Sequence, residues 1–213
     1  MKKISLIAAL LCVTLMYSQE NRYNKFSLEA AYGLNHPVSP KDNSGFDVGS
    51  FSEFKHFDIG GRYMVNSYYG FKLSYAYDRF QYANTSELAV TYNRIGIDAV
   101  FALTEMLNIS FNRDRNIQIQ AHTGVGITFA QPKSISNVEK IGSLSIGITP
   151  KFKISNRVAL TTDLSYIVNL KQHYDYGGIL IDSDYNSVTG GFINFTVGVN
   201  VYFGQRRDHA DWY

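Results

Sequence analysis

The sequence has little cysteine and proline, and after its first 18 residues it has no long hydrophobic run. Its one cysteine, Cys12, lies within those first residues, so the rest of the chain carries neither a disulfide framework nor thiol chemistry. Four prolines against 16 tyrosines, 14 phenylalanines and 17 glycines favour an all-β chain. Because no later run reaches the ~20 residues of a transmembrane helix, membrane insertion would require a closed β-barrel.

The N-terminus is typical of a secretory signal. Lys2 and Lys3 precede an apolar stretch over residues 4–15, and Ser18 offers a cleavage point. We therefore expect residues 1–18 to be a signal peptide that is removed on export. The remaining chain has 18 basic and 18 acidic residues, so its formal net charge is zero. Since it has no excess of positive charge, we expect no nucleic-acid partner.

Eight runs alternate apolar and polar residues, the pattern of strands that have one apolar and one polar face. In residues 192–203, for example, Ile, Phe and Val alternate with Asn, Thr and Gly. Most of the runs have near the ~9–11 residues that a tilted strand needs to cross the hydrocarbon core. The predicted strands cover about residues 26–35, 56–65, 69–78, 91–103, 117–129, 142–154, 158–169 and 192–203.

The connections between these strands alternate in length. Residues 66–68 and 155–157 are tight turns, whereas residues 36–55 and 170–191 are long and contain Pro or paired Gly. The connection over residues 104–116 is longer than this alternation predicts. Short turns at one end and long loops at the other are typical of outer-membrane barrels, which place the turns in the periplasm.

The apolar face of the third strand sorts its residues by depth. Tyr69, Phe71, Leu73, Tyr75 and Tyr77 share this face, with aromatic residues at both ends and an aliphatic residue between them. Aromatic residues at the interfaces and aliphatic residues at mid-depth fit a bilayer. The apolar face therefore indicates contact with lipid.

Together these patterns predict the fold class and the domain organisation. We expect an all-β protein, an eight-stranded antiparallel up-and-down transmembrane β-barrel over residues 19–204, followed by a periplasmic C-terminal tail over residues 205–213. The alternative is a soluble lipocalin-like barrel with its apolar face inward. Its interior would have to hold about thirty large apolar side chains, more than eight strands can enclose.

The opposite face of the strands collects ionisable residues of both signs. In the narrow interior of an eight-stranded barrel, unpaired charges are costly, so these groups should form a hydrogen-bonded network. Glycines on the same face should give the long side chains room. We therefore predict a plugged interior with small water pockets. The predicted lumen charge network comprises Glu29, Asp58, Arg62, Lys72, Asp78, Arg94, Asp98, His122, Lys151, Lys153 and Asp163.

Several segments resemble the barrel domain of OmpA-like outer-membrane proteins. They are residues 121–126, 147–160, 163–166 and 199–204, and the His-Ala-Asp-Trp-Tyr segment at residues 209–213. The resemblance implies an eight-stranded outer-membrane barrel. In that family the His-Ala-Asp-Trp segment is usually followed by a linker and a periplasmic peptidoglycan-binding domain. Because this sequence stops after that segment, the resemblance implies the membrane-embedded half only.

Three features suggest chemistry or metal binding, and each has a simpler interpretation. Residues 182–186 begin like a calcium loop, but its sixth and twelfth positions are Ser and Ile instead of Gly and Glu. His36, His56 and His173 lie in or beside predicted outer loops, without a nucleophile motif nearby. His122 has no second His or Cys at ligand spacing. We expect no catalytic residue, no metal and no cofactor.

The function indicated by the sequence is structural. We expect a protein of the Gram-negative outer membrane that contributes to envelope integrity, with membrane lipid as its main partner. Loops 36–55 and 170–191 would be available to envelope or surface proteins. Two alternatives remain open. One is a narrow porin-like channel for small solutes, and the other is an outer-membrane enzyme acting at the loop rim, where histidines and acidic residues would have to converge.

Overall fold

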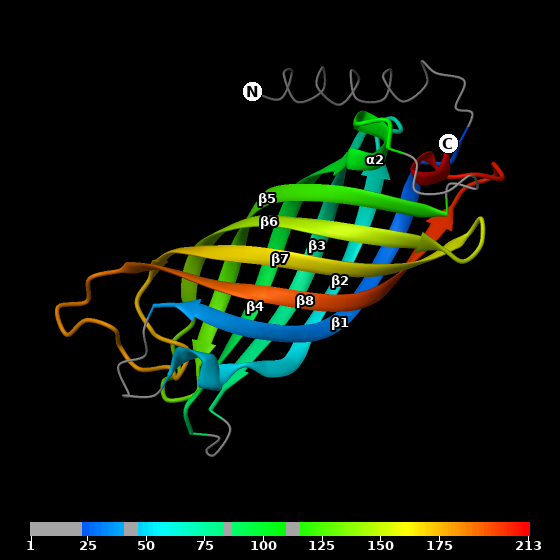
Figure 1. Ribbon diagram of the computed structural model, residues 1–213. Coiled ribbons are helices and arrows are strands. Elements are labelled where there is room, and N and C mark those ends of the chain that lie inside the picture. The colour runs from blue at the N-terminus through cyan, green and yellow to red at the C-terminus, as the bar shows by residue number, and fades with distance from the viewer. Residues whose placement is uncertain (1–22, 41–46, 83–86, 110–115) are drawn as a thin grey trace, which may run out of the picture.

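Eight antiparallel strands form one closed barrel in sequence order (Figure 1). The computed structural model describes residues 23–40, 47–82, 87–109 and 116–213, so the predicted signal peptide lies outside the described residues. The eight-stranded fold expected from the alternating pattern is confirmed. The strands are β1 (Phe26–Ser39), β2 (Glu53–Met64), β3 (Tyr69–Gln81), β4 (Ala89–Ala102), β5 (Ile117–Pro132), β6 (Glu139–Lys153), β7 (Val158–Gln172) and β8 (Val188–Phe203).

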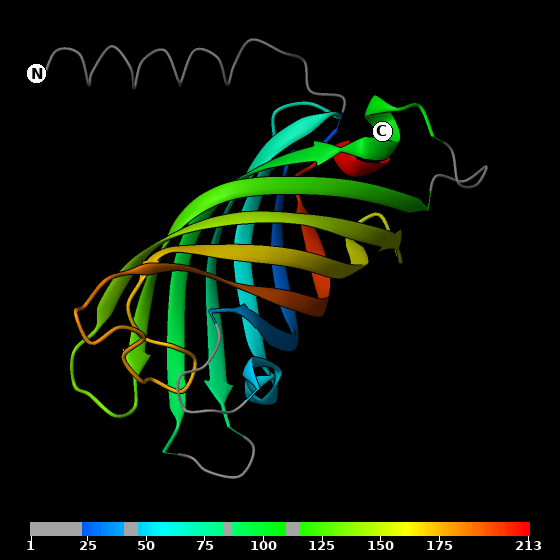
Figure 2. The ribbon, with the colours of Figure 1, turned by 60° about the vertical axis from the view of Figure 1, so that its left-hand side comes forward.

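The first and last strands close the barrel. β1 pairs with β8 from Phe26 opposite Phe203 to Ser39 opposite Gly191, with a register shift after Pro37, and it pairs with β2 on its other side. Figure 2 shows β1 and β8 lying side by side in the wall. Closure removes the free sheet edges, whose backbone groups would otherwise be unpaired in lipid.

The two ends of the barrel differ. At one end, which we call the turn end, β2 joins β3 and β6 joins β7 through short turns, and the C-terminus lies there as well (Figure 1). The short helix α2 (Leu103–Met106) follows β4 at this end. The loop end carries the connections from β1 to β2 and from β7 to β8, and the 3-10 turn η1 (Val48–Phe51). Among the described residues, no helix has the length and apolarity needed to cross a membrane.

The strands extend further toward the loop end than the sequence pattern predicts. β1 continues to Ser39 and β2 begins at Glu53, so the predicted loop 36–55 shortens to residues 40–52. Likewise, residues 173–187 remain of the predicted loop 170–191. The predicted boundaries were wrong here because strand pairing continues where the apolar–polar alternation stops.

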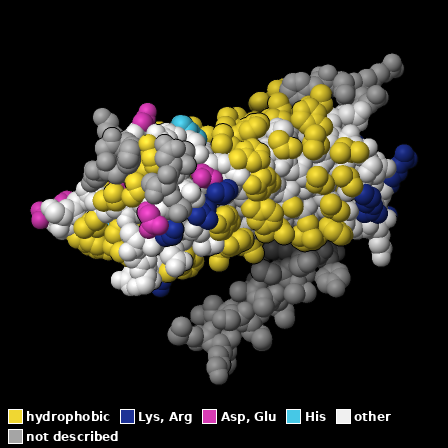
Figure 3. All heavy atoms as spheres, turned by 90° about the horizontal axis from the view of Figure 1, so that it is seen from below, with side chains coloured by type: hydrophobic (Ala, Val, Ile, Leu, Met, Phe, Trp, Pro, Cys, Tyr) yellow, Lys and Arg dark blue, Asp and Glu magenta, His cyan; other side chains and the backbone are white. Residues whose placement is uncertain are grey.

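The barrel exterior carries a belt of exposed apolar side chains (Figure 3). Leu73 on β3 is 61% exposed, and Tyr69 and Tyr75 lie outward on the same strand. The predicted orientation of the two faces is confirmed, because the apolar residues of the belt point outward whereas Arg62, Asp78 and Lys151 are buried inside the barrel. Other members of the belt include Leu28, Ile59, Phe71, Ile95, Ile97, Val125, Ile127, Leu144, Ile146, Ile148, Leu164, Phe195, Val197 and Val199.

A charge placed in the middle of this belt should destabilise the barrel. We expect Leu73→Arg to lower the free energy of unfolding by about 2–4 kcal/mol, because a guanidinium near the bilayer midplane loses its hydration. Denaturant unfolding in lipid vesicles measures this difference. The matched control is Leu107→Arg, at an exposed turn-end position beyond the strands, where we expect about 0–1 kcal/mol. Equal effects at the two positions would contradict the assignment of the belt.

Candidate functional site

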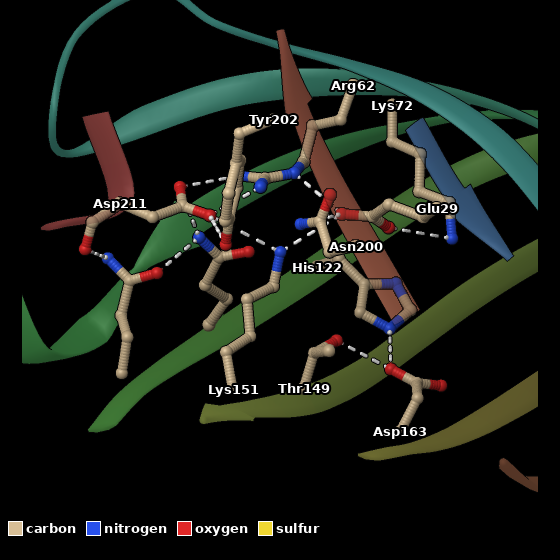
Figure 4. A network of polar contacts seen from close by, with 12 residues as sticks. Glu29, Arg62, Lys72, His122, Thr149, Lys151, Asp163, Asn200, Tyr202 and Asp211 are labelled. Carbon is tan, nitrogen blue, oxygen red and sulfur yellow. Dashed lines mark hydrogen bonds and ion pairs between the residues drawn. The ribbon is translucent and has the colours of Figure 1, made fainter. Parts of the chain in front are cut away.

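The lumen contains three clusters of polar side chains, and the first surrounds Arg62 near the turn end (Figure 4). Arg62 is 1% exposed. Its Nε donates to Glu29 Oε1 at 2.7 Å. Its Nη1 and Nη2 donate to the two carboxylate oxygens of Asp211, at 2.7 and 2.5 Å. This two-pronged geometry is the strong form of a guanidinium–carboxylate contact.

Two lysines complete the first cluster. Lys151 Nζ lies 3.0 Å from Glu29 Oε1 and 3.6 Å from Asp211 Oδ2. Lys72 Nζ lies 2.6 Å from Asp58 Oδ1 and 3.3 Å from Glu29 Oε2. Every cation of the cluster therefore faces a carboxylate, as burial of charge requires. The cations are Arg62, Lys72 and Lys151, and the carboxylates are Glu29, Asp58 and Asp211.

The second cluster surrounds His122. Its Nε2 lies 3.0 Å from Asp163 Oδ2, and its Nδ1 lies 3.7 Å from Asp98 Oδ1. The imidazole fits there because residue 147 is glycine, where a Cβ would overlap the ring. A Cβ at Gly124 would likewise overlap the Asp98 carboxylate. These glycines give room to the polar side chains, as the sequence predicted.

Ser165 beside His122 and Asp98 has the composition of a catalytic triad, but not its hydrogen bonding. The Ser165 hydroxyl donates to the Asp163 carboxylate, and its oxygen lies 3.3 Å from His122 Nε2. That same Nε2 faces Asp163, so it serves as a proton donor to a carboxylate. A nucleophilic serine needs a base that accepts its proton. Because His122 Nε2 faces Asp163, it does not serve Ser165 as the base of a triad, and the arrangement is explained by charge pairing.

The third cluster surrounds Asp78 toward the loop end. His56 Nδ1 lies 2.6 Å from Asp78 Oδ1, and Arg94 lies 3.6 Å from Asp78 Oδ2. His56 was predicted to lie in or beside an outer loop; it is a buried lumen residue on β2 instead. The parity of its strand places it on the same face as Asp58 and Arg62.

The other two histidines each have a separate partner. His36 Nδ1 lies 2.6 Å from the Ser52 hydroxyl, and His173 Nδ1 lies 2.6 Å from Glu139 Oε1. With His56 bound to Asp78, the three histidines serve three separate contacts. The three histidines therefore do not come together in one site, as an enzyme at the loop rim would require.

Aromatic side chains close the lumen at the loop end. We call this group the outer aromatic cluster; its aromatic members are Phe51, Phe80, Tyr92, Tyr176 and Phe192. The Phe80 and Tyr176 rings lie 4.6 Å apart, and all five side chains are buried. The Tyr176 hydroxyl donates to two backbone carbonyls, at 3.0 and 2.9 Å, which ties the last loop to β1 and β8.

The C-terminal segment, residues 205–213, closes the lumen at the turn end. Gly204 adopts a φ of +139°, which favours glycine, and the chain then turns back over the barrel mouth. Trp212 is 7% exposed and packs edge-on against Tyr202. Lys153, predicted to join the lumen network, lies instead beside this segment, 3.8 Å from Asp208 and 5.8 Å from the Trp212 ring.

The space left between the outer aromatic cluster and the C-terminal segment is small. A cavity of about 80 Å³ lies among the clusters, lined by both signs of charge, including Lys72, Asp98 and His122. A buried water needs about 10–15 Å³ of such volume, so the cavity has room for several waters. In the described part of the chain, no group of three or more His, Cys, Asp or Glu side chains is placed to hold a metal ion.

Two groups of the C-terminal segment have shifted pKa values. Burial alone would raise the pKa of Asp211, but the charges of Arg62 and Lys151 outweigh it and hold this pKa well below its usual range. Burial lowers the pKa of His209. Its Nδ1 accepts a hydrogen bond from the Asp211 backbone N–H at 3.1 Å, so this nitrogen carries no proton in the docked segment.

No protein-family model matches the chain, and no curated protein matches it. Solved structures do match. Neisserial surface protein A superposes with a TM-score of 0.55 at 14% identity, over 84% of this chain and 97% of that chain. A major outer membrane protein from Thermus thermophilus gives 0.54 at 11% identity, over 84% and 98%. The outer membrane protein OprG from Pseudomonas aeruginosa gives 0.52 at 8%, over 87% and 98%.

These likenesses show the fold. A closed eight-stranded barrel with an apolar exterior and a polar interior is the architecture of bacterial outer-membrane proteins. The chain is therefore a closed β-barrel with the fold of bacterial outer-membrane proteins, the fold that its resemblance to OmpA-like barrels implied.

Acid should loosen the C-terminal segment in two steps. The lowered pKa of His209 means that docking weakens as pH falls below about 6.5, where the undocked imidazole takes up a proton and the docked one does not. The lowered pKa of Asp211 means that its carboxylate stabilises the docked segment down to about pH 4, and that this stabilisation is lost progressively at lower pH.

Trp212, the only tryptophan in the chain, reports both steps through its fluorescence and acrylamide quenching. His209→Asn keeps a capping side chain without a titrating group, so it should abolish the upper step and leave the lower one. Quenching that stays constant from pH 7 to 3 would contradict the role of both groups.

Proposed function

We propose that this protein is a structural component of the outer membrane, which contributes a closed barrel to the envelope and displays its loops outside. The observation that carries this proposal is the closure of the lumen at both ends, by the outer aromatic cluster and by the C-terminal segment. The cavity between them has a volume of about 80 Å³. A solute path would require both closures to move.

The filled interior supports a stabilising role over a transporting one. Paired charges in the lumen connect β1, β2, β3, β6 and the C-terminal segment, as in the contacts of Glu29 with Arg62, Lys72 and Lys151. The contacts of Glu29 with Lys72 and Lys151 tie β1 to strands that are not its neighbours in the wall, and they resist deformation of the barrel cross-section. This favours a permanent, rigid element of the membrane.

The last loop supports a role in surface contacts. Its base is fixed, since Asp175 Oδ1 accepts from the backbone N–H groups of Gly177 and Ile179, at 3.0 and 2.8 Å. Its tip, residues 183–187, is exposed and carries an acidic and an aromatic side chain, Asp184 and Tyr185. A fixed base with an exposed tip suits contact with other envelope or surface molecules.

The two alternative functions have weaker support. A narrow channel is opposed by the two closures. An enzyme is opposed by the separate partners of His36, His56 and His173, and by the carboxylate that occupies His122. The structural relatives named above are described as surface or outer membrane proteins.

Planar-bilayer recordings distinguish the closed barrel from a channel. We expect the folded protein to show no steady conductance, because neither mouth is open. The positive control is a general porin inserted in the same membrane. Steady openings of the unmodified protein would overturn the proposal of a closed barrel.

The envelope role has its own test in cells. We expect loss of the gene to increase sensitivity to detergent and to large antibiotics, and the intact gene to restore resistance. A version lacking only residues 183–187 should also restore it, because the tip lies outside the barrel. If the strain without the gene resists as well as its parent, the structural role is refuted.

A further inference from the structure

The Asp211 carboxylate lies on the inner wall of the barrel as a ligand lies in a binding site. Besides Arg62, it accepts hydrogen bonds from Gln120 Nε2 at 3.1 Å and from the Tyr202 hydroxyl at 3.1 Å. Gln118 Nε2 donates to the backbone carbonyl of Asp211 at 2.8 Å. Four different strands supply these donors and the nearby Lys151, and all of them point at one aspartyl residue (Figure 4).

The donors are held in place without Asp211. Glu29 fixes Arg62 through Nε at 2.7 Å, which leaves both terminal nitrogens of the guanidinium free for a second carboxylate. Glu29 also holds Lys151 at 3.0 Å, and Gln120 donates to Gln118 Oε1 at 2.8 Å. If Asp211 were absent, this wall would keep its shape and carry one uncompensated positive charge.

The C-terminal segment is also held without Asp211. Asn24, just before β1, makes four hydrogen bonds to it. The Asn24 backbone N–H donates to Asp208 O at 2.8 Å, and its carbonyl accepts from the Ala210 N–H at 2.9 Å. Its side chain donates to Arg206 O at 2.6 Å and accepts from the Arg206 N–H at 2.9 Å. The hydrogen bonds of Asn24, which tether the segment to the barrel, are thus separate from the contacts of the Asp211 carboxylate.

We propose that Arg62, Lys151, Gln118, Gln120 and Tyr202 form a carboxylate-binding site at the turn end of the lumen, for which Asp211 is the built-in ligand. The two terminal nitrogens of the Arg62 guanidinium match a planar group with two oxygens, and the net positive charge of the wall favours a ligand with a negative charge. The tether gives Asp211 a high effective concentration, so free carboxylates do not displace it from the intact protein. Once the Asp211 side chain is removed, the site takes a small carboxylate from solution.

The test is chemical rescue of Asp211→Ala in the full chain, with acetate as the probe. We expect the substitution to lower the unfolding temperature by about 10 °C, since it strands a buried positive charge. Acetate should restore most of that loss in a saturable way, and it should return Trp212 quenching to the unmodified level. Acetamide, which has the same shape without the charge, should restore nothing.

Two variants serve as controls. Asp208→Ala lies in the same segment and removes a side chain that lies beside Lys153, at 3.8 Å, so it should change little and should not respond to acetate. Arg62→Met combined with Asp211→Ala removes both charges, so acetate should no longer help. If Asp211→Ala fails to fold, refolding yield in acetate against equal chloride gives the same comparison. Rescue by chloride or acetamide to the same extent as by acetate would overturn the proposal.

Discussion

A buried guanidinium between two carboxylates is the interaction on which the rest of the structure depends. Arg62 is enclosed by the barrel wall, and its loss of hydration is offset because Glu29 and Asp211 accept hydrogen bonds from all three of its nitrogens. Glu29 in turn neutralises Lys72 and Lys151. Removal of any member leaves a buried charge without its partner, so the cluster is kept as a unit.

The two ends of the lumen are closed by different chemistry. At the loop end, aromatic rings pack against one another and need only contact and exclusion of water. At the turn end, directed ionic contacts hold a segment that is not part of the wall. The aromatic closure is insensitive to pH and salt, whereas the ionic closure responds to protonation. The closure at the turn end therefore has the physical means to respond to a change in pH.

The sequence could predict the faces of the strands but not the partners across the lumen. Alternation of period two assigns Glu29, Arg62, Lys151 and Asp163 to the interior without any knowledge of the sheet. Pairing depends on register and strand tilt, which bring residues 122 positions apart, such as Glu29 and Lys151, into contact. The same alternation also assigns Phe80, Tyr92 and Phe192 to the lumen. The outer aromatic cluster could therefore be predicted from the sequence, but not from the positions of charged residues alone.

Asp211 had no such signal. It follows the last strand, where no alternation exists, and its role depends on how Gly204 and Asn24 direct the segment back into the mouth. His56 shows the opposite error, because its place near a strand end suggested a loop although its parity already assigned it to the lumen.

The position of Asn24 has a consequence for the seam of the barrel. This residue precedes the first strand and the segment it binds follows the last, so their hydrogen bonds lie beside the pairing of β1 with β8. The docked segment therefore links the two ends of the barrel chain in addition to the strand pairing. Loss of its ionic contacts would weaken the attachment of the segment at the place where the barrel closes.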